Sequence, residues 1–185
     1  MAKKEENNET FDQVIRMLNE SFGNKYNVKR HENLVKASRA DQIGIESAIR
    51  GKNAFQTDIS ITKRDIKDTP MVVVELKTGT NKFTPTTNDV ILYSARSAKH
   101  KSVFPQIRYG MIWFNGKKVP NRFILNNENM DFAFGFSDDI ISNEKDREIF
   151  LEMLREQLKT AEDTLKLLEK RKTTASMFSS IIRYE

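Results

Sequence analysis

Two short stretches between residues 54 and 77 carry their hydrophobic residues in the manner of β-strands. In the first, one side of an extended chain would carry Phe55, Thr57, Ile59 and Ile61. This period of two predicts a half-buried strand with a polar second face. In the second, residues 71–74 form a continuous run of Met and Val, which is typical of a strand covered on both faces. Turn-forming polar residues join the two stretches, and the pair is therefore predicted to be antiparallel.

The flanking segments alternate between helical and extended patterns. Helices are predicted at residues 10–22, 33–39, 42–50, 88–99 and 144–172. Further strands are predicted at residues 107–114, 122–125 and 131–136. The expected N-caps are Thr10, Asp41, either Thr87 or Asn88, and either Ser142 or Asn143. Residues 1–9 are polar and mixed in charge, and we expect them to be disordered.

The last long segment differs from the others because its apolar residues follow alternating steps of three and four. The seam consists of Leu151, Leu154, Leu158, Ala161, Leu165 and Leu168. Fewer than four heptads make a free-standing coiled coil marginal. The spacing therefore favours packing on the parent domain over contact with another subunit.

The order of these elements places the chain in the α/β class, with a mixed β-sheet that carries helices on its faces and a long C-terminal helix. At 185 residues the chain fits a single domain. Its core is expected at about residues 40–136, followed by a helical segment at about 142–185.

Composition narrows the chemistry that this domain can perform. The absence of cysteine excludes disulfides, thiol catalysis and nearly all structural zinc sites, and two histidines are too few for a His-rich metal centre. No apolar run approaches the length of a membrane span, and the first residues do not form a signal peptide, so a cytoplasmic protein without a membrane partner is expected. A net charge of +5 permits an anionic partner without requiring one.

Three charged residues lie at one end of the predicted strand pair. Asp58 falls on the polar side of the first strand, and Glu75 and Lys77 are two residues apart on the second, so they share one face. Two carboxylates and an ammonium beside an apolar run are costly unless they serve one another or bind a ligand. One interpretation is a surface salt bridge between Glu75 and Lys77, with Asp58 capping a loop. The other is a functional site.

An Asp followed by Glu-x-Lys on a hydrophobic strand resembles the PD-(D/E)XK nuclease superfamily, the fold of most restriction endonucleases. The motif here is Asp58, Glu75 and Lys77, with Thr57 where the family name has Pro. A helix that carries a glutamate and leads into the first strand is also a feature of that superfamily. Glu46 is the residue that matches it here, and Glu32 is the weaker candidate.

The resemblance implies a metal-dependent endodeoxyribonuclease with a restriction-endonuclease-like sheet. Mg²⁺ prefers hard oxygen ligands and keeps several waters, so Asp58 and Glu75 suit it, and Mn²⁺ can substitute. By resemblance, the backbone carbonyl of Leu76 is a further ligand. Lys77 would orient or deprotonate the attacking water or offset charge in the transition state, and Glu46 would hold a second metal or a water.

The double-stranded DNA substrate implies phosphate contacts from basic residues near the site. The candidates are Lys82, Arg96, Lys99, Lys101, Lys117 and Lys118. Any one of these clusters, taken alone, favours an ordinary solvated surface over a DNA contact.

The lack of a separate target-recognition domain makes the chain similar to the cleavage modules of Type IIS restriction endonucleases. It most resembles the small subunit of a heterodimeric enzyme, which implies a larger DNA-recognising subunit as partner. The enzyme alternative is a homodimeric orthodox Type II restriction enzyme or a repair or junction nuclease. The non-enzyme alternative is a DNA- or protein-binding module on a nuclease-like fold.

Overall fold

The computed structural model describes residues 2–35, 50, 54–66, 69–77, 85–114, 119–136 and 143–170. The helices are α1 (Ala2–Phe22), α2 (Thr87–Lys101), α3 (Asn121–Asn126) and α4 (Glu144–Lys170). The strands are β1 (Tyr26–Arg30), β2 (Asn33–Val35), β3 (Ala54–Gln56), β4 (Ile59–Lys63), β5 (Pro70–Lys77), β6 (Arg108–Trp113) and β7 (Phe132–Gly135).

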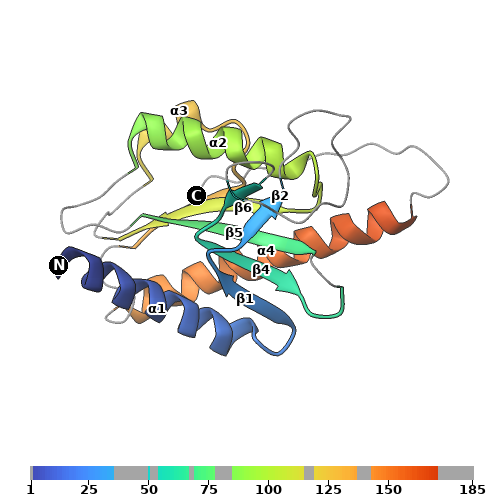
Figure 1. Ribbon diagram of the computed structural model, residues 1–185, viewed down its shortest axis with the longest axis horizontal. Helices are drawn as coiled ribbons and strands as arrows, with labels where there is room; N and C mark the ends of the chain where they lie inside the picture. The colour runs from blue at the N-terminus through green and yellow to red at the C-terminus, as the bar shows by residue number, and fades with distance from the viewer. Residues whose placement is uncertain are drawn as a thin grey trace.

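The main sheet has five strands in the order β1-β4-β5-β6-β7 (Figure 1). The pairs β1–β4 and β4–β5 are antiparallel, and the pairs β5–β6 and β6–β7 are parallel. Strands β2 and β3 form a separate antiparallel pair. A mixed sheet flanked by helices and followed by a long C-terminal helix confirms the predicted α/β class and the predicted antiparallel strand pair.

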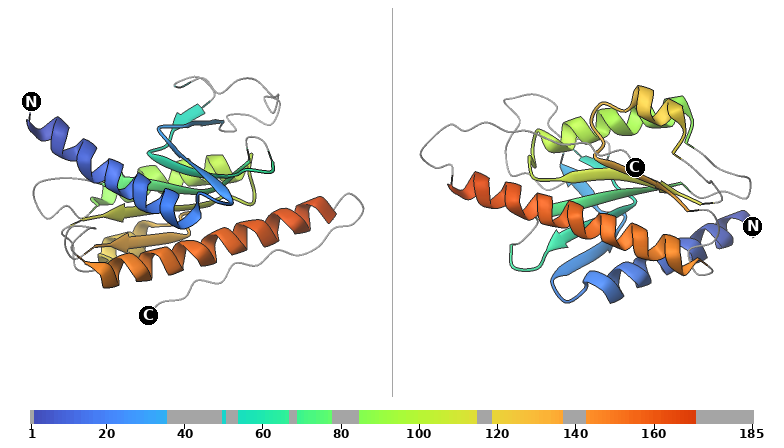
Figure 2. Two further views of the ribbon diagram at one scale, coloured as in Figure 1. Left: turned by 90° about the horizontal axis from the view of Figure 1, so that it is seen from below. Right: turned by 180° about the vertical axis from the view of Figure 1, so that it is seen from behind.

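The two faces of the sheet are covered by different helices. Helices α1 and α4 pack on one face, against the side chains of Val72, Val74 and Ile112. Helix α2 lies on the other face with α3 beside it, and there the buried side chains are those of Val73 and Met111 (Figures 1 and 2). Alternation along β5 and β6 therefore sends successive residues to opposite layers.

Helix α4 uses its predicted seam to bind the sheet. The side chains of Leu151, Leu154, Leu158 and Ala161 are buried in the core, and Leu165 packs against it. The Oδ1 atom of Asn143 accepts a hydrogen bond from the Asp146 N–H at 3.1 Å, which confirms one of the two predicted caps. Packing on the parent domain is thus confirmed for the seam through Leu165.

Helix α2 begins one residue earlier than predicted. Its N-cap is Thr86, whose hydroxyl accepts a hydrogen bond from the Asp89 N–H at 3.2 Å, while the Asp89 carboxylate accepts one from the Thr86 N–H at 3.0 Å. This reciprocal capping box satisfies two N–H groups at the start of the helix. With Thr87 or Asn88 as the N-cap, the third helical position would not be acidic, so neither residue could form this capping box.

Two predicted elements are wrong in type. Residues 33–35 form strand β2 and not a helix, because Leu34 is buried and pairs with Phe55 of β3. Residues 121–126 form helix α3 and not a strand, with Phe123 buried and Leu125 82% exposed. Short apolar runs do not distinguish helix from strand by periodicity, so the tertiary partner decides.

Helix α1 begins earlier than predicted. It begins at Ala2, so the expected disorder is wrong for residues 2–9, where alanine, lysine and glutamate are good helix formers. The predicted apolar face is correct, since Phe11, Val14 and Leu18 are buried. The helix ends before Gly23, as expected.

The predicted first strand is divided at Thr57 and Asp58 into β3 and β4. Phe55 consequently does not share a face with Ile59 and Ile61. Its ring stacks on His100 of α2 at 5.8 Å, whereas the two isoleucines face α1 and α4. The expectation of a half-buried strand is also wrong for β4, because its alternate residues Ser60 and Thr62 are buried as well.

Several predicted features lie outside the described residues: most of the helix at 42–50 and the part of the C-terminal helical segment from residue 171. Within the described part of the chain, no helix has the length and apolar character needed to cross a membrane.

Candidate active site

The two predicted carboxylates come together at one end of the β4–β5 pair. Ile59 pairs with Val74, so the preceding Asp58 and the following Glu75 lie opposite each other on the α2 face of the sheet. The Oδ2 atom of Asp58 accepts a hydrogen bond from the Leu76 N–H at 2.8 Å. The carboxyl group of Asp58 lies close enough to that of Glu75 for its charge to act on it. The predicted convergence of these two residues is therefore present in the structure.

Glu75 is almost completely buried, with 1% of its surface exposed. Burial raises its pKa to about 8, and the negative charge of Asp58 adds to the effect. A hydrogen bond from Tyr109 and the positive charge of Arg96 act in the opposite direction. A buried carboxyl group beside a second carboxylate is the arrangement that a bound cation would relieve.

Lys77 lies on the same face but is engaged by α2 and not by Glu75. Its ammonium donates to Asp89 Oδ1 at 3.0 Å and to the Tyr93 hydroxyl at 3.2 Å. Burial alone would lower the pKa of Lys77, but the hydrogen bonds with Asp89 and Tyr93 outweigh it and the pKa is raised. The ion pair with Asp89 contradicts the alternative of a simple surface salt bridge between Glu75 and Lys77.

Asp89 connects this site to the start of α2. One carboxylate oxygen accepts from Lys77, and the other accepts from the Thr86 N–H in the capping box. Burial raises the pKa of Asp89, but the hydrogen bonds from Thr86 and Lys77 prevail and the pKa is lowered. The same residue therefore begins the helix and fixes the ammonium of Lys77.

The oxygen atoms at this end of the sheet suit a divalent cation such as Mg²⁺. The carboxylates of Asp58 and Glu75 are hard oxygen donors on one face. The Leu76 N–H points toward Asp58, and the N–H and C=O of a strand residue point to the same side, so its carbonyl oxygen is directed to the same edge. Across the described residues, no group of three or more His, Asp or Glu side chains forms a candidate metal site, and the donor set there consists of two carboxylates and a carbonyl.

Two glutamates were predicted as candidates for a third acidic residue of the site, Glu46 and Glu32. Glu46 lies outside the described residues. Glu32 is already engaged, since one of its oxygens accepts from Lys29 at 2.6 Å and the other accepts from the Ser60 hydroxyl. Both carboxylate oxygens of Glu32 are therefore engaged by neighbouring side chains.

Thr57 stands at the position where the family motif has proline, and its backbone N–H is used there. Its N–H donates to the Glu32 carbonyl at 2.9 Å, and its hydroxyl donates to the same oxygen at 3.1 Å. Proline has no N–H and would leave this carbonyl with fewer partners. Thr57 thus fixes the chain just before Asp58.

The basic residues predicted to contact DNA are not equivalent. The guanidinium of Arg96 lies 5.2 Å from the ring centre of Phe55 and 5.0 Å from that of Tyr93, and Lys99 lies 5.7 Å from Phe55. Lys101 is instead committed to Asp131, with its ammonium 2.8 Å from the carboxylate. The remaining candidates, Lys82, Lys117 and Lys118, are outside the described residues.

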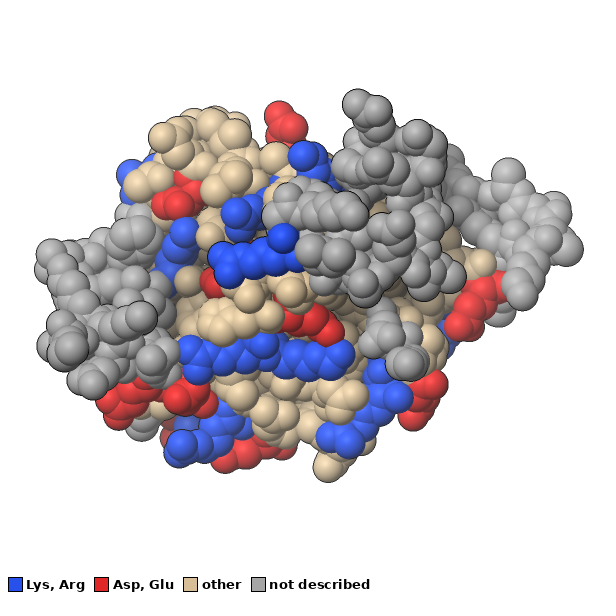
Figure 3. Space-filling model, in the orientation of Figure 1, with Lys and Arg blue, Asp and Glu red and all other residues tan. Residues whose placement is uncertain are grey.

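Lys and Arg side chains form a row across the middle of the face seen in Figure 1 and further patches above and below it, with acidic and uncharged residues among them (Figure 3).

Sequence reasoning missed Tyr109, Asp89 and Tyr93. A tyrosine inside an otherwise apolar buried strand needs a hydrogen-bond partner, which was a usable signal for Tyr109. The spacing of Thr86 and Asp89 matches a capping box with aspartate at the third position. For Tyr93 no signal beyond helical periodicity is present.

No protein-family model matches the sequence, and comparison with curated proteins and with solved structures likewise found no match.

Proposed function

We propose that this chain is a Mg²⁺-dependent endonuclease that hydrolyses phosphodiester bonds in double-stranded DNA, with Mn²⁺ able to substitute. The observation that carries the proposal is the pairing of Asp58 with the buried Glu75 on the α2 face of the sheet. The order of strands also supports the proposal: two antiparallel pairs are followed by two parallel ones, and α2 joins the first parallel pair.

In this proposal the ligands are Asp58, Glu75 and the carbonyl of Leu76. A divalent cation held by these ligands would lower the pKa of water and offset charge on the phosphate. Lys77 remains an ammonium at neutral pH because Asp89 and Tyr93 hold its proton. Its proposed role is therefore to orient the attacking water and to offset charge in the transition state. It is not the base that deprotonates this water.

The targeting of the cut is a further part of the proposal. The chain resembles the small subunit of a heterodimeric Type IIS restriction endonuclease, in which a larger subunit recognises DNA. We infer that this chain cuts one strand where such a partner directs it. One active site cuts one strand, so double-strand cleavage needs a second site from that partner or from another copy.

A supercoiled-plasmid assay with Mg²⁺ or Mn²⁺ tests the proposal. Metal contributes several kcal/mol of transition-state stabilisation, so Asp58→Ala should reduce cleavage by about 10³-fold or more. Asp163→Ala on α4, which removes an exposed carboxylate, is the matched control and should cleave like the wild type.

The pattern of products separates the targeting models. Discrete bands from the chain alone indicate a homodimer that reads its own sequence, and a smear indicates cleavage without targeting. If the chain alone is inactive, cleavage should appear on adding a larger DNA-reading protein recovered by pull-down. Equal cleavage by wild type and Asp58→Ala would overturn the site assignment.

A further inference from the structure

Tyr109 of β6 is a buried residue whose hydroxyl reaches the candidate metal ligand Glu75. The parallel register pairs Val73 with Tyr109 and Glu75 with Met111, so Tyr109 and Glu75 are diagonal neighbours on one face. Diagonal neighbours in a sheet lie within reach of a long aromatic side chain. The Tyr109 hydroxyl donates a hydrogen bond to Oε1 of Glu75.

The ring of Tyr109 is fixed from one side by aromatic contacts. The imidazole of His100 meets it edge to face, with centres 5.7 Å apart and planes at 84°. His100 in turn stacks on Phe55 at 5.8 Å. These rings come from β6, α2 and β3, so the position of the hydroxyl depends on three separate elements.

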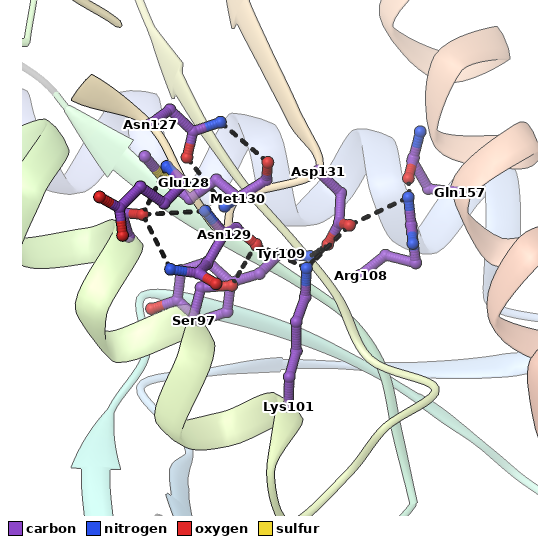
Figure 4. Close-up of polar contacts among 11 residues, drawn as sticks. Ser97, Lys101, Arg108, Tyr109, Asn127, Glu128, Asn129, Met130, Asp131 and Gln157 are labelled. Atoms are coloured by element: carbon purple, nitrogen blue, oxygen red, sulfur yellow. Dashed lines mark hydrogen bonds and ion pairs between the residues drawn. The ribbon is translucent and has the colours of Figure 1, made fainter. Parts of the chain in front are cut away.

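The backbone of Tyr109 is fixed by Asp131. The Tyr109 N–H donates to Asp131 Oδ2 at 2.7 Å, and the Asp131 N–H donates to the Tyr109 carbonyl at 2.6 Å. Lys101 and Arg108 converge on the same carboxylate, and Arg108 also contacts Gln157 of α4 (Figure 4). A donor held at both its backbone and its ring presents its hydroxyl in one place.

This rigidity has a consequence for Glu75. With Oε1 held by the hydroxyl, the carboxyl group cannot rotate without losing a buried hydrogen bond, which is costly in a low-dielectric interior. The second oxygen therefore keeps a single direction. Residues that orient metal ligands in this way typically change metal affinity by 10- to 100-fold when they are removed.

We propose that Tyr109 is a positioning residue, which sets the orientation of the Glu75 carboxylate so that it and Asp58 bind one divalent cation. This inference rests on the metal-dependent site proposed above. It assigns Tyr109 no contact with DNA or with the reacting atoms.

The test measures Mn²⁺ binding by isothermal titration calorimetry in the full chain without DNA. Tyr109→Phe removes only the hydroxyl and should weaken Mn²⁺ binding by about 10- to 100-fold. Tyr26→Phe is the matched control, because the Tyr26 hydroxyl also donates to a glutamate, Glu162, at 2.8 Å, but does so between β1 and α4. Tyr26→Phe should bind Mn²⁺ as the wild type does.

Glu75→Gln separates the failure of this inference from the failure of the metal site. If Glu75→Gln abolishes Mn²⁺ binding while Tyr109→Phe leaves it unchanged or tighter, Tyr109 has only a structural role and the inference is overturned. If wild type and Glu75→Gln bind Mn²⁺ alike, the metal site itself is wrong, and the inference is overturned with it.

Loss of the fold would be recognised by circular dichroism. Should Tyr109→Phe not fold, Tyr109→Met, whose flexible side chain fills irregular space, provides the same test without a hydroxyl. A second readout is the Mn²⁺ concentration that gives half-maximal thermal stabilisation, which should rise in the Tyr109 variants and not in Tyr26→Phe.

Discussion

The two faces of the central sheet bury very different side chains, although the same strands supply both. Toward α1 and α4, β5 contributes Val72, Val74 and Leu76, and the contacts there are almost entirely apolar. Toward α2, the same strand contributes Glu75 and Lys77, beside the buried Tyr109 and His100. Burial of polar groups costs free energy unless they are paired. One face is thus apolar, whereas the other also holds the polar groups of the proposed site.

The largest expected effect is on the apolar face. Leu154→Ala would remove a fully buried side chain of α4 and should lower the free energy of unfolding by about 2–5 kcal/mol. Urea denaturation measures the loss. The Mn²⁺ affinity of the folded fraction should not change, and a large change in that affinity would contradict the division between the two faces.

A smaller effect comes from the ionisation of Glu75 and grows with pH. Its folded pKa is about 8 against an ordinary value of 4.5, so its stabilising contribution is complete below pH 4.5 and is lost as the pH rises through 8. Glu75→Gln cannot ionise. In chelator, its melting temperature should match that of the wild type near pH 4.5 and exceed it by at least about 2–4 °C at pH 9, the shift that 1 kcal/mol produces in a domain of this size.

Glu162 on the α4 face supplies a control of opposite sign. Burial raises its pKa, but hydrogen bonds from Lys25 and Tyr26 prevail and the pKa is lowered. Its contribution to stability is therefore present above its ordinary pKa and is lost as the pH falls. Glu162→Gln should be less stable than the wild type at neutral pH, and the difference should vanish in acid. Parallel pH profiles for wild type and Glu75→Gln would contradict the buried carboxyl pair.

The smallest effect concerns DNA affinity and separates the basic residues of α2. Arg96→Met and Lys99→Met should each reduce the slope of log affinity against log salt by about 1, because each would remove a phosphate contact of the proposed DNA complex. Lys101→Met should leave the slope unchanged, since its ammonium is held by Asp131. Fluorescence anisotropy with a DNA duplex in chelator measures these slopes.

Arg155→Met on α4 is the matched control for the loss of one positive charge, because it lies on the helix that covers the other face. Its slope should equal that of the wild type. Equal reductions in all four variants would mean that binding follows net charge alone and that the α2 face has no special part in it.

The sequence by itself predicted the strand pair, the convergence of Asp58 and Glu75 at one end of it, and the seam of α4. Each of these follows from a local period, because alternation of two assigns strand residues to faces and steps of three and four assign helix residues to a stripe. The continuous Val run of β5 likewise predicted a strand buried on both sides. No distant residue is needed to obtain these features.

Only the tertiary structure decided the features that depend on a partner far along the chain. Leu34 lies in a strand because β3 lies beside it, and the hydroxyl of Tyr109 meets a carboxylate 34 residues away. Lys77 could pair with Glu75 by spacing alone, but burial of Glu75 and the capping residue Asp89 direct its ammonium to α2. Polar groups in an interior bind whichever partner the packing of helices and strands provides, and local sequence does not encode that choice.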